Sequence, residues 1–415
     1  MEKEYNIAII GLGYVGLPLA LAFSEHYKVV GYDIDEKRIL ELNKGLDNNS
    51  NIDFSRYSNL MFSSREHDIE SCNIYIVTVP TPVDNKNNPD LSALKSASSI
   101  IGSLLKKGDI VIYESTVYPG VTEEVCIPIL QDNTELIFNK EFYCGYSPER
   151  ISPGDKKYKL ETIVKITSGS TNEIAEEIDV LYKNIIKAGT YKASSIKVAE
   201  AAKVVENTQR DVNIALMNEL AMMFDKMNIR TLEVLEAAQT KWNFLDFKPG
   251  LVGGHCIGVD PYYLLHKSEQ SGYTPTLLNS SRKINNSIAY FIADKTISLL
   301  SDNGKAIKES SVLILGYTFK ENCADIRNTK VKDIVDRLSF FSCNVAVYDP
   351  YIPLLKDNIF ISDPFESNVK YDAIVVAVAH DEFLKYSIDD FEGLSQQKLV
   401  LLDVKGIYGK STWKL

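Results

Sequence analysis

The sequence predicts an α/β protein with two doubly wound parallel-sheet domains joined by a long central helix. Three observations support this. Short apolar runs alternate with helical stretches in the first 190 residues, a long stretch without glycine or proline follows, and the alternation returns after residue 310. Short apolar strands alternating with helices are typical of a parallel sheet covered by helices on both faces. We expect domains at 1–194, 195–300 and 301–415.

In the first domain, strands are expected at 5–10, 28–33, 73–79 and 110–115. The first strand runs into Gly11-x-Gly13-x-x-Gly16, which opens a helical pattern over 17–23. Glycines at this spacing allow a tight turn and let a pyrophosphate approach the helix N-terminus. Asp33 ends the next strand, where a carboxylate binds ribose hydroxyls and repels a 2′-phosphate. We therefore predict an NAD site; the alternative is a purely structural glycine turn.

The loops that follow the other strands extend this predicted site. Ligands of doubly wound sheets bind outside the carboxyl ends of the strands, which here are followed by loops at 80–82 and 116–120. The residues expected to contact NAD are Gly11, Gly13, Tyr14, Val15, Gly16, Asp33, Arg38, Pro80, Thr81 and Thr116.

The centre of the chain predicts a helix over 195–227, a run of apolar residues without glycine or proline. Such a helix, roughly 30 residues long, exceeds the usual length in globular domains and typically bridges domains or packs against its copy in a second subunit. We expect a homodimer, with a higher homo-oligomer as the alternative. Beyond it, strands are expected at 311–315, 344–348, 373–378 and 399–403, with no second glycine fingerprint.

Composition excludes several classes of partner. The net charge of −11 argues against nucleic acid, and no apolar run approaches the length that spans a bilayer. The six cysteines are scattered without a C-x-x-C pair, which fits a reducing compartment. A strand expected at residue 5 leaves no room for a signal peptide, so we expect a cytoplasmic protein. The dispersed histidines predict no catalytic metal.

Two groups of residues are candidates for covalent chemistry. Cys256 follows two glycines and precedes Asp260 by four residues, so it is either a nucleophile beside a base or an inert, buried thiol. Lys203 and Asn207 are spaced to share one face of the long helix. An ammonium and an amide there would stabilise an oxyanion, although spacing alone favours a solvated polar stripe.

Lys320 and Arg327 lie in the loop after the first strand of the last domain. This is the ligand edge of such a sheet, so two cations there suit a diphosphate. The alternative is an exposed loop stabilised by ion pairs.

In this order, the motifs resemble the UDP-glucose/GDP-mannose dehydrogenase family over nearly the whole chain. The matching segments are the glycine fingerprint followed by Leu17-Pro18, Glu114-Ser115-Thr116 with Pro119-Gly120, Ser147-Pro148-Glu149-Arg150, Lys203 with Asn207, Gly253-Gly254-His255-Cys256 with Asp260, and Lys320 with Arg327. Segments 147–156 and 253–263 are similar to the UDP-N-acetylhexosamine 6-dehydrogenases of Vi-antigen and O-antigen pathways. UDP-glucose enzymes differ in both segments.

The resemblance implies two Rossmann-like domains joined by a helical dimerisation domain, which carries the cysteine. It also implies that NAD takes four electrons from the C6 hydroxyl of a UDP-sugar, with a Cys256 thiohemiacetal and thioester between the two oxidations. The other roles it implies are oxyanion stabilisation by Lys203 and Asn207, a water held by Asp260 and Thr116, and assistance from Glu149 in the thioester steps. Expected substrate contacts are Glu149, Arg150, Ile151, Lys203, Asn207, Gly253, Lys320 and Arg327, with looser matches at Lys241, Lys248 and Arg282.

The leading prediction is a UDP-N-acetylglucosamine 6-dehydrogenase that serves capsule or O-antigen synthesis. The galacto epimer is a close alternative, and UDP-glucose a weaker one. From another class, an NAD-retaining epimerase would use Tyr-x-x-x-Lys, which occurs once, at Tyr263 and Lys267, far from the fingerprint. A non-enzymatic NAD sensor would leave the whole set of reactive residues unused.

Overall fold

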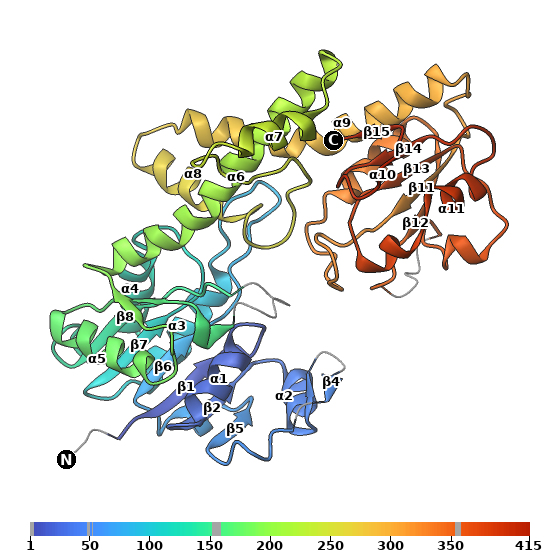
Figure 1. The fold of residues 1–415 in the computed structure, drawn as a ribbon. Helices are drawn as coiled ribbons and strands as arrows, with labels where there is room; N and C mark the ends of the chain where they lie inside the picture. Colours follow the sequence, from blue (N-terminus) through green and yellow to red (C-terminus); the bar gives the residue numbers. More distant parts are fainter. Residues whose placement is uncertain (1–3, 48–49, 52, 152–158, 353–357) are drawn as a thin grey trace. The chain divides into compact units, whose positions relative to one another are not determined.

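The computed structural model describes residues 4–47, 50–51, 53–151, 159–352 and 358–415. They form two compact units (Figure 1). Unit 1 comprises residues 1–206 and 262–273, and unit 2 comprises 207–261 and 274–415. The three-domain division at 194 and 300 stays a prediction.

Unit 1 is built on a six-stranded parallel sheet with the order β5-β2-β1-β6-β7-β8. Its strands are β1 (Asn6–Ile10), β2 (Lys28–Tyr32), β5 (Leu60–Ser63), β6 (Ile74–Val77), β7 (Asp109–Tyr113) and β8 (Phe142–Tyr146). Strand order reverses between β1 and β6, so the loops after these two strands flank the switch point where ligands bind. The sheet confirms the predicted doubly wound fold of this part.

Helices cover both faces of this sheet because its strands are buried nearly throughout. The helices of this layer are α1 (Gly16–Ser24), α2 (Glu36–Asn43), α3 (Ser92–Leu104), α4 (Ile127–Asp132) and α5 (Asn172–Lys183). Short paired strands complete the unit: β3 (Leu46–Asp47) with β4 (Ser50–Asn51), and β9 (Lys165–Thr167) with β10 (Thr190–Lys192). Its core packs Ile7, Ile9, Phe23, Ile76 and Ile112 together.

Unit 2 contains a five-stranded parallel sheet with the order β12-β11-β13-β14-β15. The strands are β11 (Ser311–Leu315), β12 (Asn344–Tyr348), β13 (Ala373–Val376), β14 (Leu401–Asp403) and β15 (Trp413–Lys414), with α10 (Val331–Phe340) and α11 (Ile388–Gly393) beside them. Here the order reverses between β11 and β13. The second α/β sheet is thereby confirmed, and its ligand edge is expected after these two strands.

Four more helices lie between the sheets along the chain: α6 (Ile196–Lys226), α7 (Thr231–Gln239), α8 (Asp260–Gln270) and α9 (Thr276–Asp302). The helix predicted at 195–227 is α6, of 31 residues. In unit 2, Arg282 of α9 forms a buried ion pair with Asp211 of α6, and Asn285 donates to the same carboxylate. Arg282 thus stabilises helix packing rather than lying open to a substrate. Among the described residues, no helix is long and apolar enough to cross a membrane.

Candidate functional site

The glycine fingerprint forms a tight turn between β1 and α1 in unit 1. Gly11 has a φ of +94°, and its N–H donates to the carbonyl of Tyr32 at 2.8 Å. A Cβ on Gly16 would lie 1.8 Å from the carbonyl oxygen of Gly11 and 2.5 Å from the hydroxyl of Thr78. Both positions therefore require glycine for the turn itself.

Gly13 differs, because a Cβ there would meet no atom within 4 Å. The first turn of α1 also has no side-chain cap, although the N–H of Leu17 donates to the carbonyl of Gly13 at 3.1 Å. An uncapped helix N-terminus beside open backbone fits a pyrophosphate. These residues thus fit the NAD that the fingerprint predicts; Tyr14 and Val15, next to the open position, are expected contacts.

Asp33 and Arg38 hold this loop from the side of β2 and α2. Asp33 accepts the N–H groups of Leu12, at 2.8 Å, and Asp35, at 3.0 Å. Arg38 donates from Nε to the carbonyl of Leu12 and from Nη2 to Asp47, at 3.1 and 2.6 Å. The Arg38 guanidinium is therefore occupied in shaping the loop, a use that its sequence position did not indicate.

The loops after β6 and β7 are tied together at the same edge of the sheet. The Thr81 hydroxyl donates to the carbonyl of Thr116 at 2.6 Å, and the Ser115 hydroxyl to that of Val79 at 2.6 Å. Tyr263 of α8 donates to the carbonyl of Thr81. The two loops that hold the predicted cofactor residues Pro80, Thr81 and Thr116 are thus hydrogen-bonded to each other.

The same contacts argue against an epimerase couple at Tyr263 and Lys267. The Tyr263 hydroxyl donates to a backbone carbonyl, and the Lys267 ammonium is paired with Glu124 at 2.6 Å. Each side chain is engaged with a different structural partner.

Glu200 of α6 is a residue that sequence reasoning missed. Its buried carboxylate accepts the N–H groups of Gly120, at 2.5 Å, and Thr122, at 2.9 Å. Burial raises its pKa to about 7, against the lowering effect of these hydrogen bonds. Glu200 thereby ties the loop that begins at Thr116 to the helix that carries Lys203. Its position one turn before Lys203 was the available signal.

The predicted reactive residues of unit 2 meet around one hydrogen bond. The Asn207 amide donates from Nδ2 to Oδ2 of Asp260 at 2.6 Å. The backbone N–H of Asp260 donates to the carbonyl of Cys256 at 2.8 Å. Asp260 is 2% exposed, whereas Cys256 is partly exposed and forms no disulfide. The structure therefore joins the cysteine segment, its carboxylate and the amide of α6.

The glycines before Cys256 serve close packing. A Cβ on Gly253 would lie 2.7 Å from the carbonyl oxygen of Asn328, and one on Gly254 would lie 2.7 Å from the ring of Phe319. Asn328 also donates to the carbonyl of Gly254 at 3.2 Å. These glycines therefore let the cysteine segment pack on the loop at 319–328.

In unit 1, Lys203 is nearly buried on α6, and Glu149 follows β8. The Glu149 carboxylate accepts the backbone N–H groups of Arg150 and Ile151. Arg150 pairs with Glu206 of α6 at 2.8 Å and donates to the carbonyl of Val164. The end of this motif, 152–156, lies outside the described residues.

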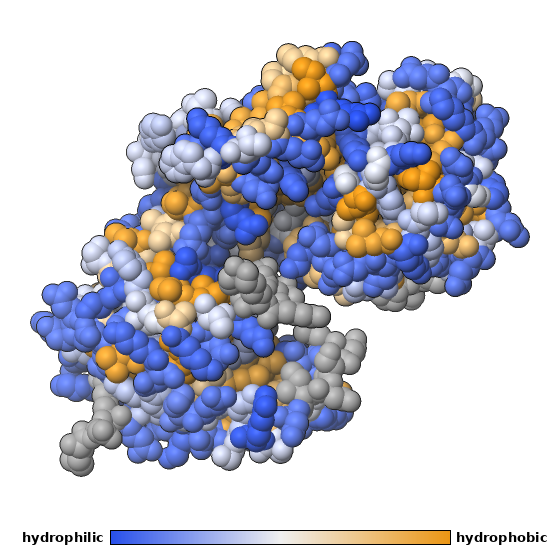
Figure 2. Space-filling model, in the orientation of Figure 1, coloured by the Kyte–Doolittle hydropathy of each residue, from blue (hydrophilic) through white to orange (hydrophobic). Residues whose placement is uncertain are grey.

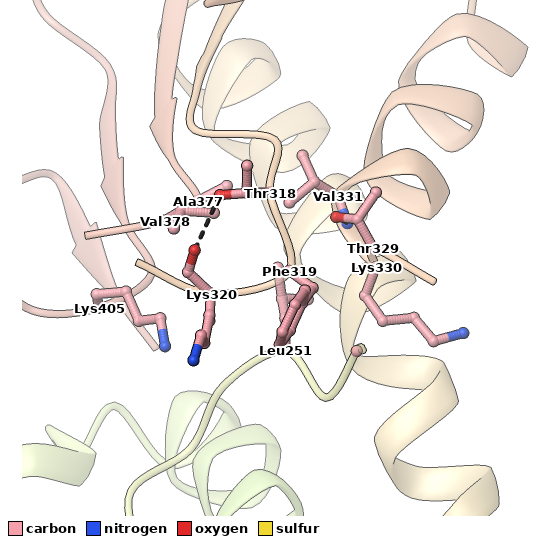
Figure 3. Close-up of a pocket in the computed structure, with 11 residues that line it drawn as sticks. Leu251, Thr318, Phe319, Lys320, Thr329, Lys330, Val331, Ala377, Val378 and Lys405 are labelled. Carbon is pink, nitrogen blue, oxygen red and sulfur yellow. Dashed lines mark hydrogen bonds between the residues drawn. The ribbon is translucent and has the colours of Figure 1, made fainter. Parts of the chain in front are cut away.

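A small hollow opens at the ligand edge of the unit 2 sheet (Figure 3). It is lined by Leu251, Gly253, Thr318, Phe319, Lys320, Thr329, Lys330, Val331, Ala377, Val378 and Lys405. In Figure 3, Lys320 and Lys405 lie side by side, and Phe319 separates them from Lys330. The two cations Lys320 and Lys405 suit a diphosphate, whereas the Lys330 ammonium pairs with Asp333 at 3.0 Å and the Thr318 hydroxyl donates to the carbonyl of Lys320.

Only part of this hollow was found from sequence. Lys320 and Gly253 were predicted there, whereas Lys330 and Lys405 were missed. Lys405 follows β14, so the rule that directs attention to strand ends could have found it. Arg327 does not line the hollow, and its guanidinium pairs with Asp325 at 2.6 Å.

The loop that carries Lys320 is held by a buried pair, Asp349 and His380. Asp349 accepts the N–H groups of Tyr317 and Thr318 and bonds to Nε2 of His380 at 2.9 Å. Burial acts to raise the pKa of Asp349, but these hydrogen bonds outweigh it and the pKa is lowered. Asn322 donates its N–H to Nδ1 of His380 at 3.0 Å. Asp349 thus holds the loop at Tyr317 and Thr318, and His380 holds it at Asn322.

Among the described residues, no group of three or more His, Cys, Asp or Glu side chains could hold a metal ion.

Family models match nearly the whole chain. The NAD binding domain of the UDP-glucose/GDP-mannose dehydrogenase family matches residues 5–186, the central domain 197–287 and the UDP binding domain 313–410.

Individual proteins agree with these matches. A UDP-N-acetyl-D-glucosamine 6-dehydrogenase of Salmonella typhi is 53% identical over 97% of this chain and 96% of its own length. One of Pseudomonas aeruginosa is 50% identical over 97% of both chains, and Protein CapL of Staphylococcus aureus is 47% identical over 97% and 96%. Among solved structures, a UDP-D-ManNAc dehydrogenase from Pyrococcus horikoshii superposes with a TM-score of 0.90 at 30% identity, covering 99% of this chain and 98% of that one.

Proposed function

Because the chain belongs to the UDP-glucose/GDP-mannose dehydrogenase family and is an NAD-dependent nucleotide-sugar dehydrogenase, we propose that it converts UDP-N-acetylglucosamine to the corresponding uronate. The two relatives at 50 and 53% identity, which carry this activity in their names, support the choice of sugar. Its galacto epimer is the second candidate, since no described contact selects the orientation of the C4 hydroxyl.

The hydrogen bond between Asn207 and Asp260 is the observation that best supports the chemistry. It joins a predicted oxyanion donor to a predicted base and, through the backbone of Asp260, to the Cys256 segment. An amide that donates one N–H to a carboxylate is held in one orientation and keeps a second N–H for an oxyanion. Cys256 combines this neighbourhood with an accessible thiol.

We propose that the reaction runs in three stages. First, the C6 hydroxyl gives a proton to a water held by Asp260 and Thr116 and a hydride to NAD⁺, leaving an aldehyde. Second, the Cys256 thiolate adds to the aldehyde, and loss of a second hydride to another NAD⁺ converts the thiohemiacetal to a thioester. Third, water adds to the thioester and Cys256 leaves as the thiolate, so one uronate and two NADH form.

Lys203 and Asn207 would stabilise the oxyanions that form at each addition, and Glu149 would take up the proton of the hydrolytic water. Arg150, Ile151 and Gly253 remain proposed contacts of the sugar. We place the diphosphate of the substrate in the hollow with Lys320 and Lys405, supported by the match of the UDP binding domain to this part of the chain.

We further propose that the protein is a homodimer through the C-terminal part of α6. Leu216 and Met223, seven residues apart, are 49 and 41% exposed, and Met227 continues the same stripe. Figure 2 shows hydrophobic side chains gathered over the region of α7 and this end of α6. An exposed apolar stripe of this kind marks an interaction surface.

CapL as a relative supports a role in capsule synthesis.

The decisive experiment compares wild type with Cys256→Ser on four sugars: UDP-N-acetylglucosamine, UDP-N-acetylgalactosamine, UDP-glucose and GDP-mannose. We expect two NADH per UDP-N-acetylglucosamine from wild type and no uronate from the variant. Cys323→Ser is the matched control, because Cys323 has the same partial exposure in the same unit. Full uronate formation by Cys256→Ser would overturn the nucleophile, and a strict preference for another sugar would overturn the substrate.

A further inference from the structure

Four buried ionisable side chains meet behind Glu149 in unit 1. Glu114 follows β7, Glu149 follows β8, Lys165 opens β9 and Tyr182 lies in α5. None of the four is more than 8% exposed. Four separate elements thus bring charge into one dry region, which is costly unless the charges are paired.

The contacts in this cluster centre on the Lys165 ammonium. It lies 2.6 Å from Oε2 of Glu114 and 3.7 Å from Oε2 of Glu149. The Tyr182 hydroxyl donates to the other oxygen of Glu114. Oε2 of Glu149 accepts no hydrogen bond from the described residues, so Lys165 provides its nearest compensating charge among them.

The cluster holds two carboxylates and one ammonium. Burial raises the pKa of Tyr182 well above its usual value, so this phenol stays neutral. Burial also raises the pKa of Glu114; Lys165 opposes this and the charge of Glu149 adds to it. The nearby Arg150 is paired with Glu206 of α6. The protonation state of Glu114 is therefore coupled to the charges of both Lys165 and Glu149.

We infer that Lys165 is a positioning residue that keeps Glu149 ionised, and that Glu114 competes with Glu149 for the positive charge of the Lys165 ammonium. This inference rests on the proposed function, in which Glu149 accepts a proton from the water that attacks the thioester. In that step an O–C bond forms, the C–S bond breaks, Cys256 leaves as the thiolate and the water proton goes to Glu149. A protonated Glu149 cannot perform it.

Removal of the ammonium gives a result that packing alone would not produce. In Lys165→Met, two buried carboxylates face each other without a cation, so one of them takes up a proton at neutral pH. We expect kcat at pH 7 to fall about 100-fold, the lower end for loss of a general base, and to recover as the pH is raised. The double variant Lys165→Met with Glu114→Gln removes the competing carboxylate as well, and we expect it to regain activity at pH 7.

The control is Lys305→Met in unit 2, where a comparably buried ammonium pairs with Asp372 at 3.3 Å. It should lower the melting temperature and leave the pH profile of kcat unchanged. Glu114→Gln alone, nearly isosteric, covers the case in which Lys165→Met does not fold. In this variant the Lys165 ammonium has only the Glu149 carboxylate to pair with. The acid limb of the pH profile of kcat should therefore move to lower pH.

Infrared spectroscopy separates this inference from the proposed function, because it needs no turnover. Lys165→Met should show the C=O stretch of an additional protonated carboxyl at pH 7, which is absent from the double variant. The inference would be overturned if Lys165→Met showed neither the additional C=O band nor a changed pH profile of kcat. It would also be overturned if Lys165→Met with Glu114→Gln were less active than Lys165→Met alone. If wild type oxidises no UDP-N-acetylhexosamine while the band appears, the proposed function fails and the charge coupling stands.

Discussion

The open position beside Gly13 gives a sharp test of where the cofactor lies. In the protein alone, a methyl group at Gly13 meets nothing within 4 Å, and the backbone there does not have a positive φ. Gly13→Ala should therefore fold with an unchanged melting temperature. If the pyrophosphate lies against this backbone, the methyl group occupies ligand space instead.

The size of the effect follows from overpacking. Forcing a methyl group into occupied space costs about 1–3 kcal/mol, which weakens NAD binding about 5- to 150-fold. Gly16→Ala should behave differently, since its Cβ would lie 1.8 Å from backbone in the protein itself. In Gly16→Ala the overpacking therefore lowers the free energy of unfolding by about 3 kcal/mol, which lowers the melting temperature by about 6–12 °C for a unit of this size.

The assay is NAD titration by calorimetry together with a thermal melt of each variant. Gly393→Ala is the control, because Gly393 also has open space and no positive φ but ends α11 in unit 2. It should bind NAD as wild type does. If Gly13→Ala folds stably and binds NAD as tightly as wild type, the placement of the pyrophosphate against the Gly13 backbone is wrong.

Three further predictions concern the residues that hold the site and the subunit contact. Asp349→Asn should raise the KM for the UDP-sugar about 10-fold, the loss of one hydrogen bond to a charged group, and leave the Kd of NAD unchanged; steady-state kinetics with each ligand varied would check this. The pKa of Glu200 is about 7 in the folded protein, above the value of 4.5 in the unfolded chain. The contribution of the protonated carboxyl to the free energy of unfolding is therefore fully present below pH 4.5 and is lost as the pH rises towards 7. Over that window the stability of wild type should fall by about 3 kcal/mol relative to Glu200→Gln, at 1.36 kcal/mol per pKa unit; parallel melting curves of the two from pH 4.5 to 8 would contradict it. Replacing both Leu216 and Met223 by Glu should convert the dimer to monomers by light scattering, whereas a monomeric wild type would remove the basis of this prediction.

Most of the fold was accessible from sequence because most of its strands are short, continuous apolar runs. The strands at 311–315 and 344–348 were predicted with their observed bounds, and the long helix to within one residue at each end. β5 and α9 were not predicted. β5 is an edge strand of four residues, only partly buried, and it carries a weak apolar signal. α9 mixes polar and apolar residues because it buries Ser281, Arg282 and Asn285 with its aliphatic side chains.

The candidate site was predictable where function dictates a local motif. Glycine turns and the cysteine segment have fixed spacing, so they are visible in one dimension. Glu200, Lys165 and His380 have no such spacing: each acts through a partner at least 16 residues away in the sequence. Only the fold brings such pairs together, and for that reason these residues were missed.

The bond between Asn207 and Asp260 also couples two proposed roles that the sequence treats as separate. A primary amide has two N–H donors, and one is committed to Oδ2 of Asp260 at 2.6 Å. Through this bond the Asp260 carboxylate fixes the direction in which the second donor points. If Asn207 stabilises the oxyanion and Asp260 holds the water, neither can be removed without disturbing the other. The losses in kcat from Asn207→Ala and Asp260→Ala should therefore be far from additive in a double-mutant cycle, whereas additive losses would mean that the two residues act independently.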